Sequence, residues 1–129
     1  MAKTKVFLVD DSADVRRAVF PLFDSHPKFE VVGEAAHGRE AVEKAPSLRP
    51  DLIILDLSMP VMNGLEAAPL LIKLLPNVWL ILLTAHELPE VQRASEKAGI
   101  HAVVLKSNAS THLIPQAEAL VYPAPSAAS

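Results

Sequence analysis

The sequence contains no cysteine. Disulfides, zinc sites built on thiolates and thiol nucleophiles are therefore excluded. Only four glycines are present, and none belongs to a glycine-lysine phosphate loop, so a P-loop is excluded and a dinucleotide or flavin cradle is poorly supplied. No apolar run reaches the roughly 18 residues that a membrane-spanning helix needs. After Lys5 only four apolar residues follow, too few for a signal peptide, and we expect a cytoplasmic protein.

The charge pattern also lacks a basic cluster. The formal net charge is −3, and lysine and arginine form no run, so direct contact with nucleic acid is not expected. The 129 residues suit one domain with its own core. We expect this domain over residues 3–121. Proline, alanine and serine dominate residues 122–129, where we expect a flexible tail or linker.

Five apolar segments, four strong and one weak, predict the strands of a sheet. The strong ones are residues 5–9, 52–55, 78–83 and 102–105, and the weak one is residues 30–33. The strong segments are rich in β-branched residues and are nearly continuous rather than alternating. Such strands are typical of a parallel sheet that is covered on both faces.

Segments with helical spacing alternate with these strands. The first begins after a cap at Ser12, the second covers residues 38–48, the third starts at Asn63-Gly64, the fourth runs from Pro89 to Gly99, and the fifth begins at Ser110 or Thr111. The alternation predicts a doubly wound α/β fold of (βα)₅ type with right-handed crossovers. Prolines 21, 69 and 115 fall inside the first, third and fifth helices, which we expect to be kinked or shortened there.

Polar side chains stand where four predicted strands end. Asp10 and Asp11 follow the first strand, Asp56 the third, Thr84 the fourth and Lys106 the fifth. Each alone has an ordinary explanation, such as a turn residue, a helix cap or a solvated charge. The carboxyl ends of parallel strands share one rim, however, where ligands bind in open sheets. The combination therefore predicts a single site.

The chemistry of this rim favours a metal and a phosphoryl group. Two carboxylates about 5 Å apart repel by roughly 3 kcal/mol at an effective dielectric near 20, so three of them need a cation. A set of oxygen ligands with few carboxylates suits Mg²⁺. A metal, an acceptor carboxylate, a hydroxyl donor and a fixed positive charge are the equipment of phosphoryl transfer.

Several motifs, in order and spacing, resemble the receiver domains of two-component response regulators. They are Val9-Asp10-Asp11, then Leu55-Asp56-Leu57-Ser58-Met59-Pro60 with Asn63-Gly64, then Leu83-Thr84-Ala85, and finally Leu105-Lys106. The resemblance covers about residues 3–121, and residues 55–67 most resemble receivers that precede a helix-turn-helix output domain. It implies a flavodoxin-like fold with strand order 2-1-3-4-5.

The resemblance also implies a role for each residue of the rim. Asp56 would accept a phosphoryl group, with Mg²⁺, from a sensor histidine kinase, a phosphotransfer protein or a small phosphodonor. Asp11, Asp56 and the Ser58 backbone carbonyl would bind the metal directly, and Asp10 would bind it through a water. Thr84 and Lys106 would then contact the phosphoryl group.

Three further positions are interpreted from the same resemblance. Ser58 and His86 each stand two residues beyond a site residue, where this family tunes the lifetime of the acyl phosphate. Val103 stands where receivers commonly carry an aromatic switch residue, and we interpret it as an ordinary buried strand residue. The remaining histidines are interpreted as surface or strand-edge residues.

Alternative functions differ in what they require of the sequence. A phosphatase of the haloacid-dehalogenase type needs a second acid two residues after its nucleophile, where Ser58 stands. We therefore expect no enzyme beyond self-phosphorylation and autodephosphorylation. A pseudo-receiver, which would bind partners without phosphorylation, remains open because of Val103. Possible partners are an output domain, another protein or a phosphorylation-linked second copy, and the chain end fits both a free-standing receiver and one that continues.

Overall fold

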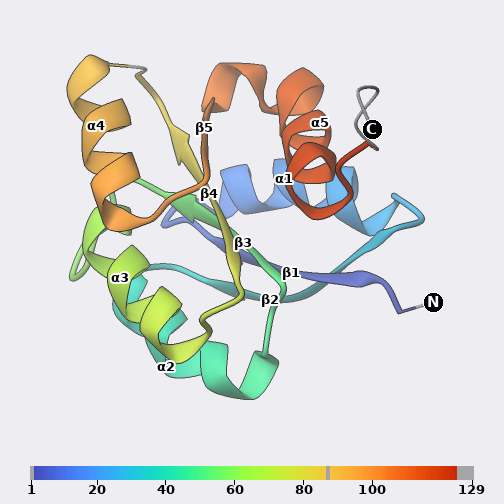
Figure 1. Ribbon diagram of the computed structural model, residues 1–129, viewed down its shortest axis with the longest axis horizontal. Helices are drawn as coiled ribbons and strands as arrows, with labels where there is room; N and C mark the ends of the chain where they lie inside the picture. Colours follow the sequence, from blue (N-terminus) through green and yellow to red (C-terminus); the bar gives the residue numbers. More distant parts are fainter. Residues whose placement is uncertain (1, 87, 125–129) are drawn as a thin grey trace.

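The computed structural model describes residues 2–86 and 88–124. Within these ranges, five strands form one parallel sheet, flanked by five α-helices (Figure 1). The strands are β1 (Thr4–Val9), β2 (Phe29–Ala35), β3 (Leu52–Asp56), β4 (Trp79–Thr84) and β5 (Ala102–Leu105). The helices are α1 (Ala13–Asp24), α2 (Gly38–Leu48), α3 (Gly64–Leu74), α4 (Pro89–Ala98) and α5 (Ala109–Val121), with a short 3₁₀ helix, η1 (Lys106–Asn108), before α5. The strand order is β2-β1-β3-β4-β5, which confirms the expected doubly wound fold.

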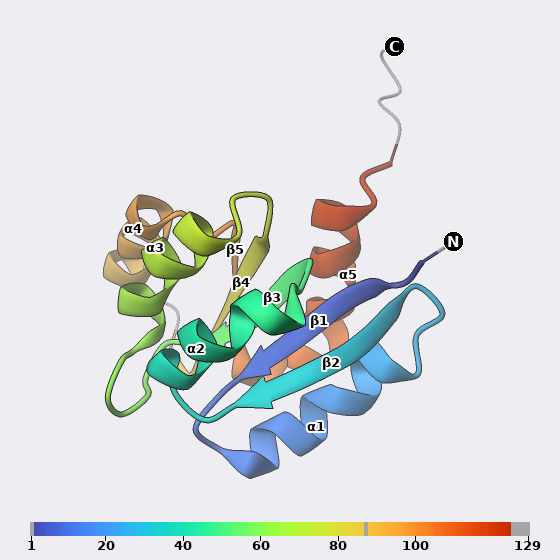
Figure 2. The same cartoon turned by 90° about the horizontal axis from the view of Figure 1, so that it is seen from below.

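Alternating side chains of the strands supply two cores, one on each face of the sheet. Phe7, Val9, Ile53 and Leu55 point to the face covered by α2 and α3, whereas Val6 and Leu8 point to the face of α1 and α5. Figures 1 and 2 show these two helix layers on either side of the sheet. Because both faces are covered, the central strands have no polar side, which explains their continuous apolar sequence.

The expected helix ends are confirmed by their capping contacts. The Ser12 hydroxyl accepts a hydrogen bond from the Val15 N–H (3.3 Å). Asn63 and Glu66 form a reciprocal capping box at the start of α3, with bonds of 2.9 and 3.0 Å. Gly99 ends α4 at a φ of 90°, in the left-handed region that favours glycine. These caps fix where each helix starts or stops, and so where the neighbouring strand ends lie.

Of the two expected effects of Pro21, Pro69 and Pro115, a kink or a shortening of the helix, the structure contradicts the shortening. The helices α1, α3 and α5 continue past these prolines, and α2 also contains a proline, Pro46. A proline inside a helix costs about 3 kcal/mol. Burial on both sides of each proline outweighs this cost, through the pairs Val19 and Phe23, Ala68 and Leu71, and Leu113 and Ala117.

The edge strand and the last helix differ in their bounds from the prediction. The weak strand expected at residues 30–33 extends over Phe29–Ala35, because it pairs with β1 from Thr4 to Val9. The last helix begins at Ala109, directly after η1. Both differences come from contacts with neighbouring elements, which local sequence pattern does not contain.

The chain end that was expected to form a tail lies partly outside the described residues. Residues 125–129 are not among them. Tyr122, at the end of α5, contacts the start of β1 through a hydrogen bond between its hydroxyl and that of Thr4. Its ring meets Phe29 edge-on, with centroids 6.0 Å apart. Among the described residues, no helix combines the length and apolar character that a bilayer crossing requires.

Ser95 of α4 is a buried polar residue. Its side chain is 1% exposed, and its hydroxyl has no hydrogen-bond partner within the part of the chain that the structure describes. A buried hydroxyl that lacks a partner keeps its desolvation cost uncompensated.

We predict that Ser95→Ala stabilises the protein by about 1 kcal/mol, because it removes this cost. Chemical denaturation followed by circular dichroism measures the change. Ser110→Ala, at an exposed position of α5, controls for helix propensity and is expected to change stability by less than about 0.5 kcal/mol. A loss of stability in Ser95→Ala, beyond that of the control, would contradict the assignment.

Candidate functional site

The carboxyl ends of the strands bring four of the expected site residues together. Asp10 and Asp11 follow β1, Asp56 is the last residue of β3, and Lys106 follows β5. Carboxylate oxygens of the three aspartates lie within 4.8 Å of one another. The parallel strands of Figure 2 run toward this edge of the sheet. The predicted cluster therefore exists in the fold, as one group of acids with one ammonium.

Backbone contacts hold the first acidic residue. The Asp10 N–H donates to the Ala35 carbonyl (3.0 Å), which extends the β1–β2 pairing by one residue. The Asp10 carboxylate accepts a bond from the Ser12 N–H (2.9 Å), at the start of α1. Asp10 is only 3% exposed, so these bonds fix its carboxylate at the buried side of the rim.

The end of β3 requires a glycine nearby. Gly64, the first residue of α3, donates its N–H to the Leu57 carbonyl (3.0 Å). A Cβ at this position would lie 2.3 Å from the Asp56 carbonyl oxygen. Only glycine lets α3 start this close to Asp56. The Asn63-Gly64 pair thus explains how the strand end and the helix start are held side by side.

The loop after β3 contains a strained residue that sequence analysis missed. Val61 has a φ of 69°, although its branched Cβ makes this region unfavourable, and its side chain is 69% exposed. The Met62 N–H donates to the Pro60 carbonyl (2.7 Å), and the Met62 carbonyl accepts from Gly38 of α2 (2.9 Å). Strain of this kind costs on the order of 1–3 kcal/mol and persists because such surrounding bonds hold the loop.

Lys106 connects the two buried carboxylates. Its Nζ lies 3.0 Å from Asp10 Oδ2 and 3.0 Å from Asp56 Oδ1. Burial alone would lower the pKa of Lys106, but its bonds to Asp56 and Asp10 outweigh burial and raise that pKa. Lys106 is therefore a fixed positive charge at this rim.

Asp56 has the most perturbed acid–base equilibrium of the site. Burial raises the pKa of Asp56 from 3.8 to about 6; the bond from Lys106 opposes the rise, and the Asp10 charge adds to it. Its Oδ2 is buried and has no hydrogen-bond partner among the described residues. One ammonium thus leaves the carboxylates only partly compensated.

These residues fit a hard divalent cation. An unpartnered carboxylate oxygen of Asp56 and two further aspartates offer oxygen ligands only, as Mg²⁺ prefers. Asp11 is exposed, and with Ser58 and Asn63 it borders an open cavity of about 560 Å³. That cavity has room for the waters that Mg²⁺ keeps.

Thr84 is near the rim, but its hydroxyl is engaged elsewhere. The hydroxyl donates to the His86 carbonyl (3.0 Å) and accepts from the His86 N–H (3.3 Å). Both Thr84 and His86 border a second cavity, of about 160 Å³, together with Asp56, Ser58 and Lys106. The structure thus places these side chains around one space without a bond from Thr84 to the acids.

Val103 lies apart from the carboxylates. It is half-buried in β5, where it pairs with Leu82 of β4. It also borders a groove of about 220 Å³ next to His112 and Gln116 of α5. The position that is commonly aromatic in receivers therefore opens onto the outer face between β5 and α5.

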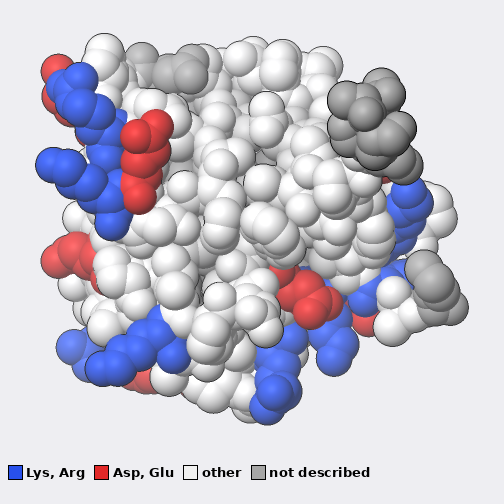
Figure 3. Space-filling view, viewed as in Figure 1, with Lys and Arg blue, Asp and Glu red and all other residues white. Residues whose placement is uncertain are grey.

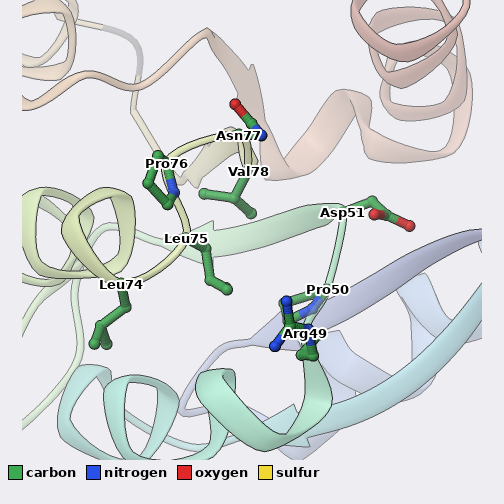
Figure 4. Close-up of a pocket in the computed structure, with 8 residues that line it drawn as sticks. All are labelled: Arg49, Pro50, Asp51, Leu74, Leu75, Pro76, Asn77 and Val78. Atoms are coloured by element: carbon green, nitrogen blue, oxygen red, sulfur yellow. The ribbon is translucent and has the colours of Figure 1, made fainter.

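Another pocket lies at the amino ends of the strands, where β3 and β4 begin. It has a volume of about 250 Å³ and lies between the loops that precede β3 and β4 (Figure 4). Figure 4 shows the Asp51 carboxylate pointing away from Leu74 and Leu75. This carboxylate accepts a hydrogen bond from the Lys5 N–H (2.9 Å), so its contact is structural.

Comparisons with known proteins point to one family. The family model for the response regulator receiver domain matches residues 6–118. The response regulator protein VraR of Staphylococcus saprophyticus is 38% identical over 110 residues, covering 84% of this chain and 52% of that protein. A protein-glutamate methylesterase/protein-glutamine glutaminase of Geobacillus kaustophilus is 53% identical over 66 residues, covering 51% of this chain and 19% of that protein. The chain thus spans about half or less of these relatives.

Solved structures show the same architecture. A LuxR-family two-component response regulator from Aurantimonas matches with a TM-score of 0.86 and 28% identity, covering 92% of this chain and 85% of that chain. The response regulator domain of Thermotoga maritima CheB matches with a TM-score of 0.81 and 30% identity, covering 89% and 93%. LuxR-family response regulators are among the matches. This agrees with the expected resemblance of residues 55–67 to receivers that precede a helix-turn-helix output domain. The chain belongs to the response regulator receiver domain family.

Proposed function

We propose that this chain accepts a phosphoryl group on Asp56 and uses the modification to change a partner-binding surface. The observation that carries the proposal is the pairing of a buried, partly uncompensated carboxylate with Lys106 at 3.0 Å, beside two further aspartates. The receiver unit would cover residues 3–121. The phosphodonor would be a sensor histidine kinase, a phosphotransfer protein or a small acyl phosphate, encountered in the cytoplasm.

The metal site would be formed by Asp11, Asp56 and the Ser58 backbone carbonyl, with Asp10 acting through a water. When bound, Mg²⁺ supplies positive charge to the oxygens of the phosphoryl group. Lys106 Nζ lies 3.0 Å from a carboxylate oxygen of Asp10 and 3.0 Å from one of Asp56. The protein's own part is therefore to hold the acids in place before the donor arrives.

In the transfer itself, a carboxylate oxygen of Asp56 would form a bond to phosphorus as the bond from phosphorus to the donor breaks. With a phosphohistidine donor, the electron pair of the broken bond stays on the imidazole nitrogen. Lys106 would neutralise charge on the phosphoryl oxygens, since its ammonium already lies beside Asp56. Asp56 is only 3% exposed, so few water molecules can compete with it for the phosphoryl group.

Thr84 would transmit the modification. Its hydroxyl has two bonds to the His86 backbone, so it must leave them to reach a phosphoryl group on Asp56. The β4–α4 loop would then change its conformation, which biases a pre-existing equilibrium between two states. Val103 stands where receivers commonly carry an aromatic residue that moves together with the threonine. Without that ring, the signal would pass through the loop and α4.

The surface that receives this signal would be formed by α4, β5 and α5. Figure 3 shows that the face over β5 and α5 has few charged side chains, while charges gather at its edge over α4. The groove bordered by Val103, His112 and Gln116 lies on this side. Possible partners are an output domain, a separate protein or a second copy of the chain. The same face would serve a pseudo-receiver without phosphorylation.

Phosphorylation can be tested by intact mass after incubation with acetyl phosphate. We predict a gain of one phosphoryl group that requires Mg²⁺ and is lost in Asp56→Asn. The variant keeps the shape of the side chain but replaces the carboxylate that would accept the phosphoryl group with a neutral amide. Asp14→Asn, an exposed acid of α1, is the control and is expected to react like the wild type. A wild type that gains no mass under any condition would instead support the pseudo-receiver.

The raised pKa of Asp56 predicts a pH-dependent stability difference. A protonated Asp56 stabilises the fold below about 3.8, and this contribution is lost as pH rises through about 6. We therefore predict that Asp56→Asn, in EDTA, is more stable than the wild type at pH 7.5, by on the order of 2 kcal/mol. Denaturation curves from pH 3.5 to 8 test this, and equal stabilities at pH 7.5 would contradict the burial effect. Asp14→Asn again serves as control.

The role of His86 in the lifetime of the acyl phosphate is a separate prediction. His86 is exposed and borders the cavity next to Asp56 and Lys106, where its ring can limit the access of water. We predict that His86→Ala loses its phosphoryl group several-fold faster than the wild type. Decay is followed by intact mass after removal of the donor. His112→Ala, on α5, is the control, and an unchanged decay rate in His86→Ala would refute the role.

A further inference from the structure

Arg16 of α1 makes a contact with the acidic rim that the roles assigned above do not include. One guanidinium nitrogen, Nη1, donates a hydrogen bond to the backbone carbonyl of Asp10. The Nε donates to the Glu34 carboxylate at the end of β2 (2.9 Å). The Arg16 side chain is 19% exposed, so the guanidinium is largely covered. It thus joins three elements at the point where the chain leaves β1.

The carbonyl that Arg16 binds belongs to the peptide between Asp10 and Asp11. On the other side of Asp10, the N–H is bound to the Ala35 carbonyl (3.0 Å). The Asp10 carboxylate is held by the Ser12 N–H (2.9 Å). Arg16 therefore completes the restraint of Asp10 and fixes the plane of the peptide that leads into the exposed Asp11.

Of the three aspartates, Asp11 is the one whose side chain is least restrained by burial. It is exposed, whereas Asp10 and Asp56 are each only 3% exposed. The direction in which the Asp11 carboxylate leaves the backbone depends on the peptide plane before it. A carboxylate that is already directed at the metal loses less conformational entropy when the metal binds.

We propose that Arg16 is a positioning residue for the metal site, acting through the Asp10 carbonyl on the carboxylate of Asp11. This role rests on the proposed function. Glu34 contributes to this positioning, because its carboxylate orients the Arg16 guanidinium and offsets the positive charge of that group close to a cation site. The Glu34 backbone is itself bound, since its carbonyl accepts a bond from Lys44 Nζ of α2 (3.0 Å).

Positioning and plain electrostatics predict opposite results. If Arg16 acted only as a charge near the acids, its removal would strengthen the binding of a cation, because like charges repel. If it positions Asp11, its removal weakens binding. Groups that orient metal ligands typically contribute about 10–100-fold to metal affinity. The sign of the change therefore distinguishes the two explanations.

The experiment measures the dissociation constant of Mg²⁺ by titration calorimetry for the wild type, Arg16→Met and Arg16→Lys. Arg17→Met is the matched control, because Arg17 is the next residue of α1, has a side chain 72% exposed and pairs only with Asp14 among the described residues. Thermal unfolding of each variant in EDTA separates an effect on the fold from one on the site. We expect Arg16→Met to bind Mg²⁺ about tenfold more weakly, and Arg17→Met to bind it like the wild type. Arg16→Lys, which keeps a donor for the carbonyl, is expected to recover part of the loss.

The outcomes separate this role from the proposed function. A wild type that binds Mg²⁺, with Arg16→Met equal to it or tighter, would overturn the positioning role alone. Equal weakening in Arg16→Met and Arg17→Met would also overturn it, since Arg17 pairs with Asp14 and the loss could then not come from the contact between Arg16 and the Asp10 carbonyl. A wild type that binds no Mg²⁺ would overturn both the metal site and the role of Arg16.

Discussion

The burial of closely spaced carboxylates at one rim is the constraint on which the rest of this structure depends. Asp10 and Asp56 are almost fully buried, and Asp11 is close to both. Carboxylates about 5 Å apart repel by roughly 3 kcal/mol at an effective dielectric near 20. A single ammonium, Lys106, lies 3.0 Å from two of them and does not restore Asp56 to its usual pKa. The negative charge of the rim is therefore incompletely neutralised, and a divalent cation would neutralise it further.

The fold can sustain this rim because the two apolar cores are elsewhere. Side chains on both faces of the sheet supply the burial, and the strand ends are left for polar residues. Backbone bonds then fix those ends, as when Gly64 brings the start of α3 against Asp56. The strained Val61 lies in the loop after β3, and the hydroxyl of Thr84, at the end of β4, is bound to His86 in the loop that follows. Loops can change their conformation at lower cost than strands, which is why a modification at the rim could be transmitted through them.

Much of this arrangement could be predicted from the sequence. The continuous apolar strands gave the layers, and the position of Asp10, Asp56 and Lys106 after three strands gave the cluster. What could not be predicted depends on contacts between distant elements. Helices survive Pro21 and Pro115 because the residues around each proline are buried against the sheet. In the sequence, Arg16 has no feature that distinguishes it from other helix residues, and only the fold shows that it donates a hydrogen bond to the Asp10 carbonyl. The φ of Val61 likewise follows from bonds of its neighbours, not from valine's own preference.

The most direct test of the central claim is the pKa of the Asp56 carboxyl group, measured by carbon-detected NMR titration without metal and with saturating Mg²⁺. The account predicts a pKa raised to about 6 without metal, because the carboxylate is buried and incompletely compensated. With Mg²⁺, the pKa should fall below its ordinary value, since the cation favours the ionised form. An ordinary pKa without metal, unchanged when Mg²⁺ is added, would contradict the claim that this rim requires a cation.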